Sequence, residues 1–245
     1  MGKTSKIFNR KPTLRSLAKR VDKIQGDTEV KWHHAFSYSV TALVITNGLR
    51  FNAPKTFLIS GVGQGDGGYE RIGDSITTTS LRLAGQVYMP GGGATLGVDF
   101  KARLIVWVYK KTAGVAPVLF GPSASAGDPP PLFLTATTGT YPAVWEQYNV
   151  AQECYEHYDV LYDKTYNLET KVGAWDSDSN TASSVNPAAY FEVNIPFRRK
   201  LGFRNYLPDV PSSCDTNAVY MTWITDSQSS YLQVEGMTRI GFKDL

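Results

Sequence analysis

Through most of the chain, apolar and polar residues alternate with a period of two, which is typical of half-buried β-strands. In residues 32–45, one set of alternate positions is largely aromatic or aliphatic and the other holds mainly small or polar residues. Residues 75–89 hold three consecutive threonines at 77–79, followed by spaced apolar residues, which favours a second strand. Residues 102–109 are apolar at nearly every position, so they predict a strand covered on both faces.

The second half of the chain continues this pattern. Residues 156–162 and 164–170 predict two strands separated by a turn at Asp163-Lys164. Three more alternating segments close the chain, at residues 191–197, 219–223 and 232–242. The sequence therefore predicts an all-β fold with eight strands.

The connections between these strands are long and uneven. They comprise a glycine-rich loop at 61–73, a surface loop at 110–155 with at most a short helix near 142–150, and a polar loop at 173–187. Such connections fit an antiparallel β-sandwich better than a meander with short turns. No internal repeat or second boundary is present, so residues 29–245 predict one domain.

Residues 1–28 follow a different pattern. Apolar residues recur there at helical spacing, at Leu14, Leu17, Val21 and Ile24. Pro12 suits the start of a helix and Gly26 suits its end, so we expect a short amphipathic helix in this segment, named here the basic arm.

Charge separates the arm from the body. Residues 1–25 carry eight cations against Asp22, a net charge of +7, whereas the other 220 residues carry 17 cations and 21 anions and sum to −4. A cation that neutralises a phosphate releases counterions, so the arm suits a nucleic acid. The candidate nucleic-acid-binding residues are Lys3, Lys6, Arg10, Lys11, Arg15, Lys19, Arg20 and Lys23. A solvated tail and a helix lying on a membrane surface are the alternatives.

A second basic cluster comprises Arg198, Arg199 and Lys200, at the end of a predicted strand. Contact with phosphate and a solvated sheet edge are equally good interpretations of it. Trp32 could stack on bases, although packing in the core is the more common use of such a residue.

Segments of the sequence match the known motifs of nucleotide binding and of metal binding only in part. Gly63, Gly65 and Gly68 match G-x-G-x-x-G, but a strand follows where a dinucleotide site needs a helix. The Asp176, Asp178 and Asn180 segment lacks the glycine and glutamate of a calcium loop, which leaves a calcium ion shared between subunits as an alternative.

Few residues in the chain could serve as nucleophiles or metal ligands. Its three histidines are His33, His34 and His157, and the first two lie on opposite faces of one strand. Cys154 and Cys214 are expected to be reduced thiols, and a strand would point Cys154 and His157 apart. We therefore expect no enzyme activity, no metal and no cofactor. The longest apolar run is about six residues, so no membrane span is expected either.

Three segments together resemble capsid proteins of circular Rep-encoding single-stranded DNA (CRESS-DNA) viruses. They are Glu29-Val30-Lys31-Trp32 at the start of the body, residues 64–74 with the sequence QGDGGYERIGD, and residues 161–166 with the sequence LYDKTY. The resemblance runs from the arm to the last strand and is most specific at residues 64–74. The arm is shorter and less rich in arginine than in circoviruses, and the last strand lacks their aromatic pair.

The resemblance implies a jelly roll of eight strands in two four-stranded sheets, which self-assembles into an icosahedral (T=1) shell of commonly about sixty copies. It also implies that the arm packages a single-stranded genome, with DNA favoured over RNA, and that the protein resides in the virion and, during assembly, in the host nucleus. Outer loops would meet a host receptor or glycan. The alternatives are the capsid protein of a small RNA or satellite virus and a cellular carbohydrate-binding β-sandwich.

Overall fold

Antiparallel strand pairing dominates the part of the chain that the computed structural model describes. The described residues are 30–36, 55–88, 99–110, 117, 119, 131–133, 147–148, 152–169, 171–176, 181–185, 188–204, 214–226 and 232–244. The chain divides into two units, Met1–Val30 and Lys31–Leu245, and the description below concerns the second. The basic arm, with its predicted helix, lies outside the described residues.

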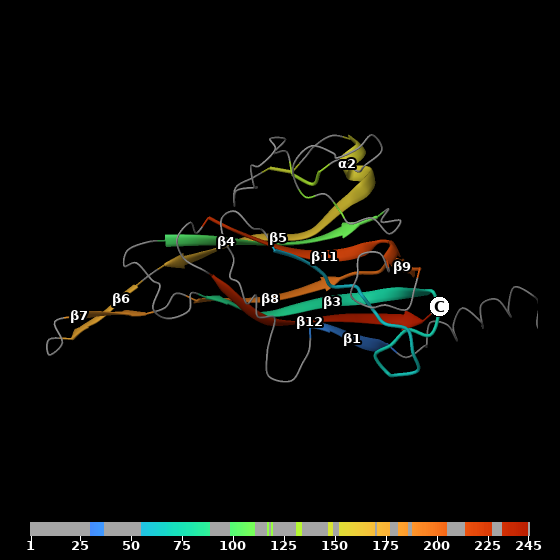
Figure 1. The fold of residues 1–245 in the computed structure, drawn as a ribbon, viewed down its shortest axis with the longest axis horizontal. Coiled ribbons are helices and arrows are strands. Elements are labelled where there is room, and N and C mark those ends of the chain that lie inside the picture. Colours follow the sequence, from blue (N-terminus) through green and yellow to red (C-terminus); the bar gives the residue numbers. More distant parts are fainter. Residues whose placement is uncertain are drawn as a thin grey trace, which may run out of the picture. The chain divides into compact units, whose positions relative to one another are not determined.

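Two antiparallel sheets form a β-sandwich (Figure 1). The six-stranded sheet has the order β1-β12-β3-β9-β10, and β8 also pairs with β3. Its strands are β1 (Lys31–Phe36), β3 (Ser75–Tyr88), β8 (Ala188–Pro196), β9 (Lys200–Phe203), β10 (Cys214–Thr216) and β12 (Gln233–Asp244). The four-stranded sheet has the order β2-β11-β4-β5 and comprises β2 (Lys55–Leu58), β4 (Asp99–Tyr109), β5 (Tyr158–Glu169) and β11 (Ala218–Thr225).

The core lies between these sheets and contains a cluster of three aromatic rings. Phe191 on β8 packs against Trp223 on β11, with the ring centroids 5.3 Å apart, and Tyr166 on β5 lies 6.1 Å from Trp223 and 6.2 Å from Phe191. Leu81 and Leu83 on β3 are fully buried in the same core. The alternation of apolar side chains along each strand thus points one face of each sheet inward.

The other face of the four-stranded sheet is also buried along β4 and β11. On it, Trp107 stacks on Tyr220 at 4.9 Å and donates a hydrogen bond from its indole Nε1 to Thr222 Oγ1 at 2.9 Å. Described residues of the long connection between β4 and β5, among them Leu132 and Phe133, are buried in the same core. This connection was predicted to be a surface loop, and that prediction is wrong for these residues.

Most of the predicted strands are confirmed. β3, β4, β8, β11 and β12 match the predicted segments within a few residues, and β4 is buried from Ala102 to Tyr109, as a strand covered on both faces should be. β1 begins as expected, while residues 37–45 lie outside the described part of the chain.

The predicted turn at Asp163-Lys164 is wrong. β5 runs without interruption from Tyr158 to Glu169 and pairs along β4. Asp163 stays within the strand because its carboxylate accepts hydrogen bonds from Arg103 on β4, at 2.8 Å and 2.6 Å. The residues before Tyr158 belong to a short helix, α2 (Gln152–His157), and not to the strand that was predicted to start at Glu156.

Other elements were not predicted. β6 (Lys171–Asp176) and β7 (Thr181–Val185) pair with each other where a polar loop was expected. The short strands β2, β9 and β10 were also missed, so the two sheets hold six and four strands rather than eight in all. The helix predicted near residues 142–150 lies largely outside the described residues, and Tyr148 within it forms a β-bridge with Phe133.

Two glycines face each other across the six-stranded sheet and make room for the core aromatic cluster. Gly85 on β3 pairs with Gly236 on β12 and with Phe191 on β8. A Cβ atom on Gly85 would lie 2.1 Å from the carbonyl oxygen of Glu235 and 2.8 Å from Cζ of Phe191. Since backbone atoms cannot give way as a flexible side chain does, the sheet accepts no side chain at this position.

We expect Gly85→Ala to destabilise the fold by about 2 kcal/mol or more, because the added methyl group forces the paired strands or Phe191 to move. Urea unfolding monitored by circular dichroism measures this difference. Gly68→Ala is the control, since a Cβ atom there has no neighbour within 4 Å. Equal stability of the two variants would contradict the explanation.

Candidate nucleic-acid interface

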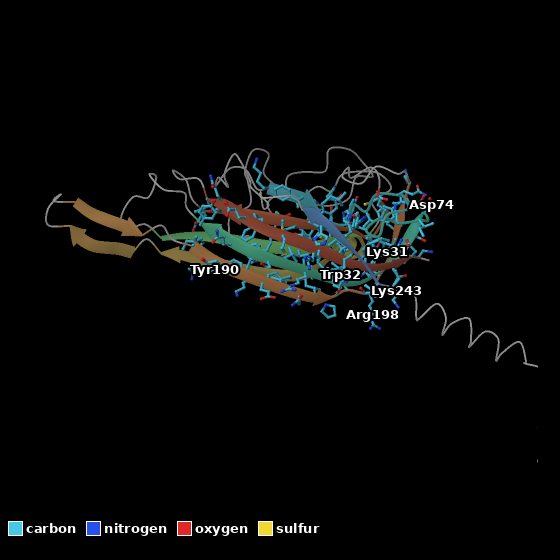
Figure 2. All side chains as sticks on the ribbon, turned by 90° about the horizontal axis from the view of Figure 1, so that it is seen from below. Lys31, Trp32, Asp74, Tyr190, Arg198 and Lys243 are labelled. Atoms are coloured by element: carbon cyan, nitrogen blue, oxygen red, sulfur yellow. The ribbon has the colours of Figure 1, made fainter. Side chains whose placement is uncertain are left out.

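The outer face of the six-stranded sheet is open to solvent. Successive side chains of a strand point to opposite faces, so the residues between the buried ones on β3, β8 and β12 point outward. Figure 2 views this face of the molecule from below. Three large apolar side chains on it are exposed, Tyr190 at 78%, Met237 at 45% and Trp32 at 43%.

Strand register gathers cations at one end of this face. Lys243 on β12 pairs with Thr77 on β3, which in turn pairs with Lys200 on β9. Four residues before Lys243 on β12, Arg239 pairs with Arg82 on β3. Arg198 follows β8 and is exposed, and Figure 2 shows it near Lys243. The set is named here the basic end and comprises Arg82, Arg198, Lys200, Arg239 and Lys243.

The opposite end of the same face is acidic. Glu192 pairs with Ala84 and Glu235 pairs with Gln86, two and four residues beyond Arg82 along β3. Glu192 forms an ion pair with Arg82 at 2.7 Å. Glu235 accepts a hydrogen bond from Tyr88, and this bond together with burial raises the pKa of Tyr88 to about 12. Positive charge is therefore concentrated at the basic end and not spread over the sheet.

Trp32 lies at the basic end and not in the core, contrary to the expectation from sequence. On β1 it pairs with Gly241 on β12. A Cβ atom on Gly241 would lie 3.3 Å from Cζ3 of Trp32 and 2.7 Å from Oγ1 of Thr79. The missing side chain of Gly241 thus lets the indole lie against the sheet while part of its surface stays in solvent. An aromatic ring exposed among cations can stack on an unpaired base.

His34 leaves the charge of Arg239 intact. Arg239 Nε donates a hydrogen bond to His34 Nδ1 at 3.3 Å. Burial, helped by the charge of Arg239, lowers the pKa of His34, so the imidazole is neutral at pH 7. Because the acceptor is uncharged, this hydrogen bond orients the guanidinium without neutralising it.

The predicted cluster of Arg198, Arg199 and Lys200 does not act as a unit. Arg198 and Lys200 are exposed, whereas Arg199 is bound to the fold. Its backbone nitrogen donates to Thr78 Oγ1 at 3.0 Å, its carbonyl accepts from Thr78 N at 2.9 Å, and its guanidinium bonds to Asp159 on β5. Arg199 therefore ties the six-stranded sheet to the four-stranded sheet.

Asp159 receives a second cation, because Lys110 Nζ lies 2.7 Å from its carboxylate. Burial acts to raise the pKa of Asp159, but the hydrogen bonds and charges of Lys110 and Arg199 outweigh it and hold the pKa below its ordinary value. The carboxylate is thus ionised at neutral pH and binds both cations.

The eight candidate residues of the basic arm lie outside the described residues. Sequence reasoning missed Arg82, Arg239 and Lys243, although the alternation along β3 and β12 carries a signal for them. Each is outward-facing, out of phase with buried residues such as Leu81 and Ile240. What the sequence lacks is the pairing that brings these strands together.

Other chemistry finds little support in the described ranges. They contain no group of three or more His, Cys, Asp or Glu side chains that could hold a metal ion. No helix among the described residues is long and apolar enough to cross a membrane. Cys154 lies on α2 instead of a strand, and burial raises the pKa of its thiol. Comparison of the chain with models of protein families and with curated proteins finds no match.

We expect Asp159→Asn to reduce the stability at pH 7 by about 1 kcal/mol, because both Lys110 and Arg199 lose a charged partner. A carboxyl group with a lowered pKa stabilises the fold above its unfolded pKa of about 3.9, and this contribution disappears as the pH falls through the folded pKa. The difference between the variant and the wild type should therefore shrink below about pH 4, as measured by urea unfolding at several pH values.

Glu192→Gln is the matched control, because the ion pair of Glu192 with Arg82 is largely exposed, at 60% and 46% of the side chains. It should change the stability by less than about 0.5 kcal/mol. A loss as large as that of Asp159→Asn would show that Asp159 has no special role in joining the sheets.

Proposed function

We propose that the protein is a viral capsid subunit that self-assembles into a closed shell and packages a single-stranded genome. The observation that carries this proposal is the basic end of the six-stranded sheet, with Trp32 exposed among its cations. The basic arm joins the body at β1, and Lys31 on that strand pairs with Phe242, the neighbour of Lys243. β1, the strand that follows the arm in the sequence, therefore borders the basic end.

The order of the strands supports a jelly roll. With the short strands β9 and β10 set aside, one sheet has the order β1-β12-β3-β8 and the other β2-β11-β4-β5. The first and last strands are thus neighbours in one sheet, and β2 and β11, the strands next to them in this eight-strand series, are neighbours in the other. This is the pattern that two interleaved Greek keys give, and jelly rolls of this kind build viral capsids.

The chemistry of the basic end favours a single strand over a duplex. Lysine and arginine bind phosphates of either, but a flat sheet face inserts nothing into a groove, and Trp32 can stack only where bases are unpaired. Binding of this kind tolerates any sequence and weakens steeply with salt. With about sixty arms of charge +7, a shell would carry about 420 positive charges for its genome. The role is structural and not enzymatic.

Electron microscopy of the purified protein tests the proposal, combined with a nuclease digest of whatever nucleic acid co-purifies. We expect uniform closed particles that protect nucleic acid. Removal of residues 1–25 should leave the fold intact and strongly reduce the protected nucleic acid, because most of the neutralising charge is lost. A monomer free of nucleic acid at moderate salt would contradict the proposal, and a truncated protein that packages normally would contradict the role of the arm.

Binding of fluorescent single-stranded oligonucleotides at increasing salt tests the basic end. Replacing Arg198, Lys200 and Lys243 together by glutamine should reduce the slope of log K against log salt by about 2, at about 0.7 per lost phosphate contact. Trp32→Ala should weaken binding about tenfold and leave the slope unchanged, since stacking releases no counterions. Tyr190→Ala is the control for Trp32, because Tyr190 is exposed at the acidic end. An equal effect of the two aromatic variants would contradict the assignment.

A further inference from the structure

The glycine-rich loop at residues 64–74 is tightly held. Arg71 is 1% exposed, its Nε donates to the carbonyl of Val62 at 3.1 Å, its guanidinium also bonds to the carbonyl of Gly73, and it lies 4.3 Å from the ring centroid of Phe203. A buried arginine that donates hydrogen bonds to loop carbonyls fixes the path of the backbone. The loop is therefore ordered before it meets a partner.

Contacts to both chain ends of the body add to this order. Lys31 Nζ donates to the carbonyl of Glu70 at 3.1 Å, and the backbone nitrogen of Ile72 donates to Asp244 Oδ1 at 3.1 Å. Within the loop, the backbone nitrogen of Gly67 donates to Glu70 Oε2 at 2.8 Å. Binding through a loop that is already ordered loses little conformational entropy.

This rigid loop presents apolar side chains to solvent. Tyr69 is 65% exposed and Ile72 is 63% exposed, among the most exposed large apolar residues that the structure describes. Two carboxylates accompany them, because Asp66 and Asp74 are also exposed. Rigid aromatic side chains of this kind are the usual anchors of protein interfaces. The loop is thus an apolar projection with negative charge around it.

A pocket with the opposite character lies at the start of β5. Its volume is about 530 Å³, and its lining includes Leu132, Tyr155, Val160 and Arg199. Val160 is 40% exposed and Tyr155 is 62% exposed, so the pocket has an accessible apolar rim. Arg199 and Lys110 share the single carboxylate of Asp159 beside it, which leaves an excess of positive charge among these three groups.

We propose that Tyr69 and Ile72 of one copy dock into the pocket beside Arg199 and Val160 of a second copy. Apolar surface meets apolar surface, and Asp66 and Asp74 approach Arg199, which lines the pocket, and Lys110, which shares the carboxylate of Asp159 with it. The Tyr69 hydroxyl keeps a polar partner, since Arg199 and Asp159 both line the pocket. The occupant is a second copy because the proposed function, on which this inference rests, requires a contact that every subunit repeats.

The two surfaces differ, so the contact is head-to-tail and not two-fold. Each copy offers its loop to one neighbour and its pocket to another, and such contacts close into rings when the rotation between subunits allows it. This geometry distinguishes the proposal from loop-to-loop pairing, in which identical surfaces would meet.

Sedimentation of the full-length protein with two variants tests the contact. Tyr69→Ala removes the anchor of the loop, and Val160→Glu places an anion in the pocket opposite the acidic loop. Each variant alone should associate at least about tenfold more weakly than the wild type. Tyr190→Ala is the matched control, because it removes an exposed tyrosine elsewhere and should associate normally. Circular dichroism verifies that each variant is folded.

An equimolar mixture of the two variants provides the second measurement. The Val160→Glu copy keeps an intact loop and the Tyr69→Ala copy keeps an intact pocket, so the mixture should form a one-to-one dimer that neither variant forms alone. Absence of that dimer, or wild-type association of either variant, would overturn the proposal.

The outcome is separable from that of the proposed function. If the wild type forms closed particles and both variants do so equally well, the capsid function stands and this contact is wrong. If the wild type forms small rings that the variants abolish, without closed particles, the contact stands and the capsid function is wrong.

Discussion

The packing of Phe191 against Trp223 and Tyr166 between the two sheets decides which side of the six-stranded sheet faces solvent. Side chains along a strand alternate, so once Phe191 points inward, Tyr190 and Glu192 must point outward. Because β8 pairs with β3, β3 with β12 and β12 with β1, the orientation of Phe191 also fixes which residues of the other strands face outward. A slip of one residue would bury cations and expose leucines. The core contact therefore places the charges of the basic end on the open face.

Among the described residues, the outer face of the four-stranded sheet is buried along β4 and β11 and exposed along part of β5, where a half-buried ion pair lies. On its outer side, Arg103 bonds to Asp163, and the Tyr148 hydroxyl donates to the same carboxylate at 2.6 Å. Burial alone would lower the pKa of Arg103, but its bond to Asp163 raises it above the ordinary value, so the guanidinium stays charged although its side chain is only 9% exposed. In the part of the chain that the structure describes, the sandwich is thus asymmetric, since the outer face of the four-stranded sheet is covered along β4 and β11 and that of the six-stranded sheet is open.

The sequence alone predicted the strands in which apolar and polar residues alternate strictly. It misplaced the elements whose structure depends on a partner far away in the sequence. β12 was predicted correctly because Val234 and Ile240 lie an even number of residues apart and both point into the core. Asp163 was assigned to a turn on local preference, and its partner Arg103 lies 60 residues away. The basic end was missed for the same reason, because its cations come from separate strands that only the register brings together. The local sequence pattern determines which residues share one face of a strand. The strands that pair with it determine what that face contacts.

Under the proposed function, the arm and the body act jointly on the genome. The arm precedes β1 in the sequence, and Lys31, the first residue of β1, forms an ion pair with Asp244 at 2.8 Å. This pair anchors the first residue of the body beside Lys243, so in the proposed capsid a strand bound by the arm would be tethered to the chain that carries the basic end. In the proposed capsid, two weak, salt-sensitive contacts on one chain would act together on one strand, and stacking on Trp32 would need no sequence preference. On this argument, the division of cations between arm and sheet is itself what allows a short arm to suffice.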